Sequence, residues 1–180
     1  MIIKKLNFKN VLLIKPKIFR DERGFFFENL KINSLEKVLK YKVNFIQENI
    51  SISKKNTFRG MHFQIKPYEQ AKLVTVLRGS IYDIIVDLNK KSKTYKKKKI
   101  IKLDSKKFNS VFVPRGYAHG FISLENDTLV KYNIDNIYNP KSERCLSYRE
   151  INFDKIFSKK NLIISKKDIE GKSFRQLGYN

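Results

Sequence analysis

The chain has 180 residues, which is the length of one domain and enough to bury a hydrophobic core. Hydrophobic residues make up 41% of it, and its 9 tyrosines and 14 phenylalanines exclude a disordered basic tail. No run approaches the roughly 18 apolar residues of a membrane helix, and the N-terminal apolar run lacks the small-residue cleavage site of a signal peptide. The single cysteine, Cys145, excludes an internal disulfide. We therefore expect a cytoplasmic protein with no membrane partner.

The net charge of +22 raises the question of a nucleic-acid partner. Only eight of the 39 basic residues are arginine, and the lysines are spread along the chain. Proteins that read nucleic acids tend to concentrate arginine on one element. We interpret the charge as a bias of surface composition, so that we expect no nucleic-acid partner. The same field would help to steer an anionic small molecule toward the protein.

Short β-strands dominate the predicted elements. Segments rich in Val, Ile, Tyr and Phe alternate with clusters of Gly, Asn, Asp or Lys. A tight turn at Gly79 and Ser80 joins two of these segments. In chain order the predicted strands cover residues 11–17, 45–53, 59–64, 72–79, 81–88, 97–103, 109–116, 119–124 and 128–134.

The segment INSLEKVLKY predicts a helix between the first two of these strands. Asn33 is the expected N-cap, and Glu36 follows three residues later as in a capping box. Leu35, Val38 and Leu39 share one face, which is typical of a helix that packs on a core.

The overall pattern is that of one all-β domain. Many short strands at regular spacing predict a sandwich or barrel, with a jelly roll as the first choice and its core at about residues 44–137. After Pro140 the strand pattern weakens, and residues 151–162 are expected to hold a second short helix.

The stretch RGMHFQ, residues 59–64, contains one of the only two histidines in the chain. Strand alternation places Met61 and Phe63 on one face and His62 and Gln64 on the other. Taken alone, such a histidine is as well explained by a core position that hydrogen bonds satisfy as by a functional role.

The stretch VPRGYAHGF, residues 113–121, holds the second histidine in a P-x-G-x-x-H spacing. Together with the earlier G-x-H, it resembles the two sequence motifs of cupin jelly rolls. Many cupins hold a metal with three histidines and a glutamate, whereas this chain has only His62 and His119. A site of two histidines and a carboxylate stays formally open, but no H-x-H or H-x-x-x-E spacing surrounds either histidine. We expect neither a metal nor another cofactor.

The motifs taken together are more specific than any one of them. RGMHFQ, Lys72 in QAKLV, PRGYAHGF, Tyr132 and Tyr138 in KYNIDNIYNP, and finally SKKD follow one another after FRDERGFFFE and FIQENISIS. In order and spacing this series resembles the dTDP-4-dehydrorhamnose 3,5-epimerase family, whose members are metal-free, cupin-type homodimers. The resemblance implies one cupin-type domain over 1–180. Its N-terminal strands would be paired or exchanged in the dimer, and segment 140–180 would close the site.

The resemblance also implies catalytic roles. The family epimerises a dTDP-linked 4-keto-6-deoxy sugar, whose ketone acidifies the hydrogens on carbon-3 and carbon-5. Such a reaction needs a base, a group that stabilises the enolate oxygen, and an acid on the opposite face. The implied base is His62 with Asp168 as its partner, and the implied acid is Tyr132. Lys72 is the candidate for the enolate oxygen, with His119 as a second polar donor.

Further positions match the substrate-binding residues of the family. Arg59 corresponds to an arginine that binds phosphate, for which a planar guanidinium is suited. In isolation, Arg23 and Glu28 are equally well explained as an ion pair in a surface hairpin, Lys167 as a surface lysine and Tyr138 as a core residue. The implied substrate-binding set is Arg23, Glu28, Gln47, Asn49, Arg59, Lys72, His119, Tyr138, Glu143 and Lys167.

The sequence departs from the family pattern at one point and leaves several alternative functions open. The family has tryptophans near its C-terminal end, whereas this chain has none and offers Tyr148, Glu150 and Phe153 there. Epimerisation at one carbon or keto isomerisation on a related nucleotide sugar is the nearest alternative function. A cupin that only binds a sugar or nucleic acid is a second alternative. A metal-dependent cupin oxygenase is disfavoured by the histidine count.

Overall fold

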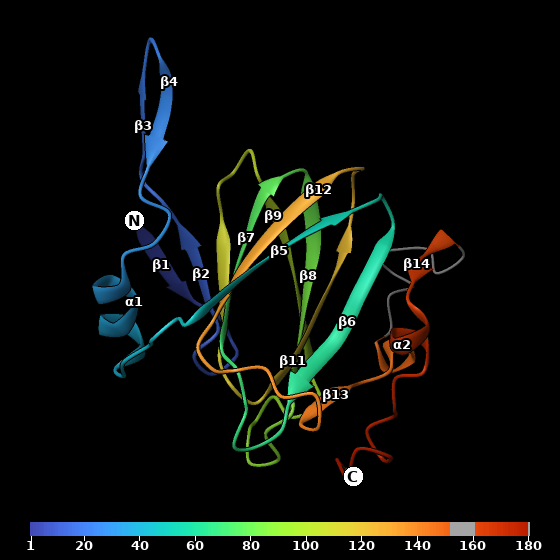
Figure 1. The fold of residues 1–180 in the computed structure, drawn as a ribbon. Coiled ribbons are helices and arrows are strands. Elements are labelled where there is room, and N and C mark those ends of the chain that lie inside the picture. The colour runs from blue at the N-terminus through green and yellow to red at the C-terminus, as the bar shows by residue number, and fades with distance from the viewer. Residues whose placement is uncertain (152–160, 180) are drawn as a thin grey trace.

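The computed structural model describes residues 1–151 and 161–179, and it forms two β-sheets that lie face to face (Figure 1). The order of the first sheet is β1 (Ile2–Lys5), β2 (Leu12–Lys15), β10 (Ser110–Val113), β7 (Lys72–Arg78), β12 (Thr128–Ile134) and β5 (Gln47–Ser53). The order of the second sheet is β13 (Glu143–Cys145), β6 (Thr57–Gln64), β11 (Tyr117–Ser123), β8 (Ser80–Asp87) and β9 (Lys98–Asp104). The short β14 (Ile163–Ile164) runs parallel to β6.

The other elements are few and short. The strands β3 (Ile18–Asp21) and β4 (Gly24–Phe27) form a separate hairpin that projects from one end of the molecule (Figure 1). The helices are α1 (Ile32–Leu39), α2 (Lys166–Ile169) and the 3₁₀-helix η1 (Tyr148–Glu150). None of the helices in the described residues is long and apolar enough to cross a membrane.

This architecture confirms the predicted all-β, cupin-type jelly roll with short helices. Each predicted strand overlaps an observed one, while β1, the two hairpin strands, β13 and β14 were not predicted as separate strands. Residues 152–160 of the second expected helix, and with them Phe153, lie outside the described residues.

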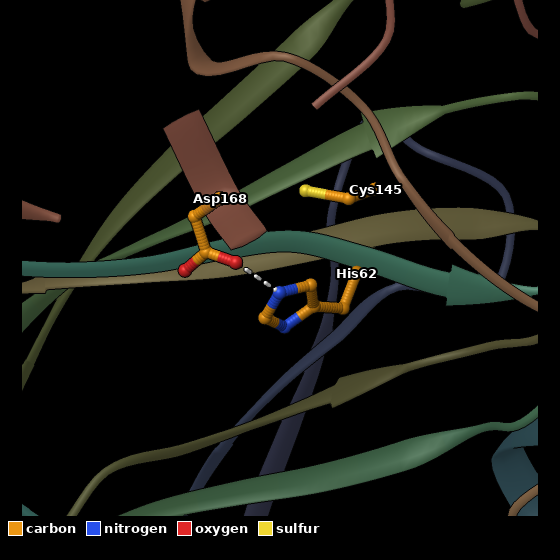
Figure 2. A group of neighbouring side chains, drawn as sticks. All are labelled: His62, Cys145 and Asp168. Carbon is orange, nitrogen blue, oxygen red and sulfur yellow. Dashed lines mark hydrogen bonds and ion pairs between the residues drawn. The ribbon is translucent and has the colours of Figure 1, made fainter. Parts of the chain in front are cut away.

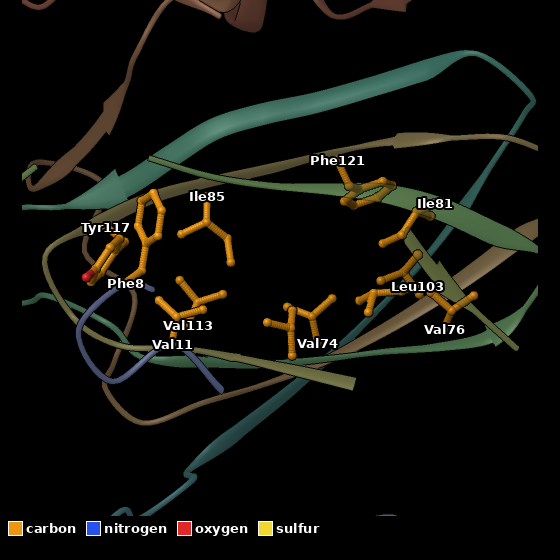
Figure 3. Packing of buried hydrophobic residues seen from close by; sticks show 12 residues of the cluster. Phe8, Val11, Val74, Val76, Ile81, Ile85, Leu103, Val113, Tyr117 and Phe121 are labelled. Carbon is orange, nitrogen blue, oxygen red and sulfur yellow. The ribbon is translucent and has the colours of Figure 1, made fainter. Parts of the chain in front are cut away.

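The main hydrophobic core fills the space between the two sheets (Figure 3). Alternate residues of each strand point into it, such as Val74 and Val76 on β7 or Ile81 and Ile85 on β8. The same alternation puts Lys72 and Asp83 in these inward rows. Polar groups therefore occupy one part of an otherwise apolar interior.

Both sheets are also covered on their outer faces. The helix α1 packs Leu35 and Leu39 against strands of the first sheet, and the partly buried Val38 packs there too, which confirms the predicted apolar face. On the second sheet, Met61 and Phe63 pack outward against C-terminal side chains that include Phe174. Because Met61 and Phe63 face this outer layer, His62 must face the interior, as strand alternation predicted.

The predicted tight connection at Gly79 exists, and it joins β7 to β8, which belong to different sheets. Gly79 has a φ of +77°, and a Cβ on it would lie 2.6 Å from Oγ1 of Thr128. The glycine therefore turns a corner between the sheets, close to β12.

The predicted capping box of α1 is wrong. The helix begins at Ile32 with Lys31 in the N-cap position, so Asn33 already lies in the first turn. Glu36 instead accepts a hydrogen bond from the amide of Val43 at 2.9 Å and forms an ion pair with Lys42 at 3.0 Å. The glutamate thus ties the helix to the chain that follows it.

Candidate active site

The two histidines are direct neighbours on adjacent strands. His62 on β6 and His119 on β11 are register partners in the second sheet, so both side chains point to the same face. At Gly120 the register shifts, and a Cβ there would lie 2.7 Å from both the carbonyl oxygen of Arg59 and Sδ of Met61. The absence of a side chain at Gly120 therefore allows β6 and β11 to approach closely beside the histidines.

His62 and Asp168 form a hydrogen-bonded dyad. The distance between Nε2 of His62 and Oδ1 of Asp168 is 2.6 Å, although the residues are 106 positions apart (Figure 2). The other carboxylate oxygen accepts from the amide of Gly60 at 3.2 Å, and Ser165 caps α2 by accepting from the amide of Asp168. Two separate contacts therefore hold the orientation of this carboxylate.

The environment keeps Asp168 ionised. Burial raises its pKa, but the hydrogen bond and charge of His62, together with the Gly60 amide, outweigh burial and hold the pKa below its ordinary value. An ionised carboxylate accepts the Nε2 proton of a neutral imidazole. Nδ1, which lies on the far side of the ring from Asp168 in Figure 2, is then the unprotonated nitrogen.

A second buried pair lies beside the dyad. Nε2 of His119 is 2.7 Å from Oδ2 of Asp83, and both residues are buried. Among the residues that the structure describes, Oδ1 of Asp83 has no hydrogen-bond partner. Sequence reasoning missed Asp83, although a charged residue at an inward position of the apolar strand IYDIIVDL is a detectable signal.

Lys72 enters this polar region from the start of β7. Burial lowers its pKa to about 8, against the attraction of the carboxylates of Asp83 and Glu143. Lys72 therefore exchanges its proton near neutral pH and carries its charge below about pH 8.

Tyr132 approaches from the opposite sheet. It lies on β12 in the first sheet, whereas His62 lies on β6 in the second. Burial raises the pKa of Tyr132, and the charge of Arg59 opposes this only in part. The phenol therefore keeps its proton at neutral pH.

Two adjoining cavities collect the predicted site residues. The larger has a volume of about 410 Å³ and the smaller about 170 Å³, and both are lined by His62, Lys72 and Tyr132. The larger adds Arg59, His119, Lys167 and Asp168, and the smaller adds Gln47, Asn49, Tyr138 and Glu143.

Polar side chains at the edge of these cavities hold one another in place. Arg59 donates from Nε to Oγ of Ser53 at 3.1 Å and from Nη2 to the carbonyl of Ile52 at 3.2 Å. One oxygen of Glu143 accepts from the hydroxyl of Tyr138 and from Nζ of Lys167, each at 2.7 Å. Lys167 is exposed, as its explanation as a surface lysine expects, and it also belongs to a three-residue network with Tyr138 and Glu143.

Within the described part of the chain, Arg23 and Glu28 are the two predicted site residues that line neither cavity. Arg23 forms an ion pair with Asp21 at 2.6 Å, and Glu28 forms one with Lys31 at 2.7 Å. The surface-hairpin explanation is thus right about the hairpin but wrong about an Arg23–Glu28 pair.

Gln64 is a site residue to which the sequence motifs assigned no role. Its buried side chain donates to the carbonyls of Tyr68 at 2.9 Å and Ile137 at 3.2 Å, and it accepts from the amide of Asn139 at 2.7 Å. The glutamine therefore lines the smaller cavity and joins two loops, one of which carries Tyr138.

The two histidines do not share a metal-binding arrangement in the described part of the chain, since each pairs with its own carboxylate. The group with ligand spacing there is His62, Cys145 and Asp168, whose ligand atoms lie within 4.8 Å of one another.

The profile of the dTDP-4-dehydrorhamnose 3,5-epimerase family matches residues 5–176. This chain belongs to that family. The epimerase of Shigella flexneri is 35% identical to it over 179 residues, which cover 99% of each chain.

Solved structures of the epimerase family agree with this fold. The enzyme from Elizabethkingia anophelis superimposes with a TM-score of 0.93 at 34% identity and covers 98% of this chain and 97% of its own. The enzyme from Legionella pneumophila, solved with dTDP-4-keto-L-rhamnose, has a TM-score of 0.89 at 31% identity and covers 96% and 92%.

Proposed function

We propose that this epimerase-family chain converts dTDP-4-dehydro-6-deoxy-glucose into dTDP-4-dehydro-rhamnose without a cofactor, as a step of rhamnose biosynthesis. One observation carries the proposal. His62, which pairs with Asp168 of α2, and Tyr132 come from opposite sheets and line the same cavity, together with the buried Lys72. Family membership and the sugar nucleotide bound to the Legionella relative support this choice of substrate.

His62 is the proposed base for both carbons. Its Nδ1 takes the proton from carbon-3 or carbon-5 next to the 4-keto group, and the C–H electron pair moves into the enolate. The ionised Asp168 stabilises the imidazolium that forms, which lowers the barrier to proton removal. General-base catalysis of this kind contributes about 10²–10⁴-fold.

Lys72 and Tyr132 complete the reaction. The ammonium of Lys72 stabilises the negative charge on the enolate oxygen, with His119 as a second polar neighbour. The hydroxyl of Tyr132 delivers its proton to the opposite face of the same carbon, and the configuration inverts. Proton exchange with solvent then restores the neutral imidazole and the phenol.

The remaining cavity residues are the proposed contacts for the sugar nucleotide. Arg59 and Lys167 place two cations in the larger cavity, as a diphosphate requires. Gln47, Asn49 and Tyr138 line the smaller cavity with Glu143 and supply polar and aromatic surface. The net charge of +22 would favour the approach of an anionic substrate.

We also propose a homodimer that completes the site. The hairpin β3–β4 projects from the body, and on it Phe26 is 66% exposed and the side chain of Arg23 85% exposed (Figure 1). On β5, which lies at one edge of the first sheet, Ile50 and Ile52 are each 58% exposed. An apolar open edge of this kind is satisfied by pairing with a second copy.

In this dimer Arg23 of the hairpin and Glu28, which directly follows it, would contribute to the nucleotide site of the partner chain. Light scattering combined with titration of dTDP tests both parts. We expect a dimer, and a variant Arg23→Ala that stays dimeric but binds dTDP more weakly. A monomer that binds dTDP as tightly as its relatives do would overturn the shared site.

The activity is tested by proton NMR of the purified protein with dTDP-4-dehydro-6-deoxy-glucose in heavy water. Deuterium at both carbon-3 and carbon-5 is expected. Deuterium at one carbon would favour the single-carbon alternative. Binding without any exchange would favour the non-catalytic cupin.

A further inference from the structure

Cys145 lies beside the catalytic dyad without a role in the proposed reaction. It is on β13, where it is the register partner of His62. Figure 2 shows its sulfur near the His62 ring and the Asp168 carboxylate, and the ligand atoms of the three residues lie within 4.8 Å of one another. Three different elements, β6, β13 and α2, thus bring an imidazole, a thiol and a carboxylate together.

These three groups match the ligand preferences of one metal in particular. Zinc binds imidazole nitrogen, thiolate sulfur and carboxylate oxygen, usually as four tetrahedral ligands. Zinc–sulfur and zinc–nitrogen bonds of about 2.3 and 2.0 Å place the two ligand atoms roughly 3.5 Å apart. Small side-chain movements from the observed spacing therefore suffice, and water can fill the fourth position. Magnesium and calcium prefer oxygen ligands and do not suit this set.

We infer that His62, Cys145 and Asp168 form an inhibitory site for Zn²⁺. The ion takes Nε2 of His62, so the imidazole proton moves to Nδ1. The thiol of Cys145 loses one proton to solvent as its sulfur binds the ion, and the carboxylate of Asp168 becomes a ligand. With Nδ1 protonated, the imidazole no longer acts as a base. This consequence rests on the proposed catalytic role of His62, whereas metal binding itself does not.

The surroundings of Cys145 disfavour covalent modification of the free thiol. Burial and then the charge of Asp168 raise the pKa of Cys145 to about 12, so the free thiol stays protonated. A protonated thiol reacts slowly with oxidants and alkylating reagents. A bound cation, in contrast, neutralises the negative charge of Asp168 and replaces the thiol proton directly.

The test uses the full chain, treated with EDTA and then freed of the chelator. Chelation should leave turnover unchanged, because the proposed chemistry requires no metal. Added Zn²⁺ should inhibit, EDTA should reverse the inhibition, and Mg²⁺ should have no effect. In Cys145→Ser the basal turnover should persist, and the zinc concentration for half inhibition should rise at least about tenfold. Changes outside the ligand shell already cost about 10–100-fold in metal affinity.

Cobalt provides a readout that does not depend on activity. Co²⁺ added to the wild-type chain should give a thiolate-to-cobalt absorption band that is absent from Cys145→Ser and from Cys145→Ala. Circular dichroism shows whether each variant is folded. If neither variant folds, the cobalt absorption spectrum of the wild-type chain alone decides whether the thiolate binds the metal. Equal zinc sensitivity in the wild type and a folded variant, or no thiolate band in the wild type, would overturn the site. A cobalt band in a protein without epimerase activity would instead refute only the proposed function.

Discussion

Replacing Asp168 by asparagine should remove most of the activity while the fold persists. The substitution keeps the shape of the side chain but removes the charge that accepts the Nε2 proton of His62 at 2.6 Å. An asparagine amide can donate to Nε2, which would leave the imidazole proton on Nδ1, where the base is needed. The variant therefore loses both the correct tautomer and the stabilisation of the imidazolium.

The size of this loss follows from the geometry of the pair. Two unit charges with centres about 4 Å apart attract by about 4 kcal/mol at an effective dielectric constant of ~20. This corresponds to roughly a 10³-fold slower proton transfer. The exposed Asp127, which lies in a turn with a φ of +53° that asparagine also adopts, offers a matched control.

The assay compares turnover and solvent exchange in Asp168→Asn, Asp127→Asn and the wild type, with circular dichroism as the check of folding. We expect a loss of about 10²–10⁴-fold in the first variant, the range for a general base, and wild-type rates in the second. Turnover of a folded Asp168→Asn within about tenfold of the wild type would refute the catalytic role of the dyad, since the attraction between the two charges would then have no effect on the rate.

Three further predictions concern the acid, the oxyanion and the loops. Tyr132→Phe should exchange substrate protons with heavy water but invert the centres slowly. If NMR shows that exchange and inversion are lost equally, Tyr132 does more than act as the acid. Turnover should fall as the pH rises through about 8, because burial lowers the pKa of Lys72 to about 8 and the amine is charged only below it. Lys72→Arg, which stays charged, should not show this fall. If the fall persists in Lys72→Arg, Lys72 is not its cause. Gln64→Glu should raise KM about tenfold or more with a smaller change in kcat, because two donated hydrogen bonds of about 1 kcal/mol each are lost. The exposed Gln176→Glu is the control. An unchanged KM in Gln64→Glu would show that Tyr138 needs no support from Gln64.

Local sequence patterns were enough to predict most strands and the direction of the key side chains. A period of two is a local property of an extended chain, so alternation alone showed that His62 lies on the face opposite Met61 and Phe63. The same reasoning would have found Asp83, a charged residue at an inward position between Ile81 and Ile85. The family motifs then indicated which inward residues belong to a site, and their catalytic roles stay predictions.

Which of these residues lie next to one another depends on the packing of the whole chain. The dyad joins positions 106 residues apart, and His119 pairs with Asp83 on a neighbouring strand. The tight turn at Gly79 could be predicted from the sequence, but not that it leads from one sheet to the other. Strand pairing depends on how both faces of each sheet are buried, against α1 on one side and the C-terminal segment on the other. That burial is a property of the whole packed chain, so no local pattern in the sequence contains it.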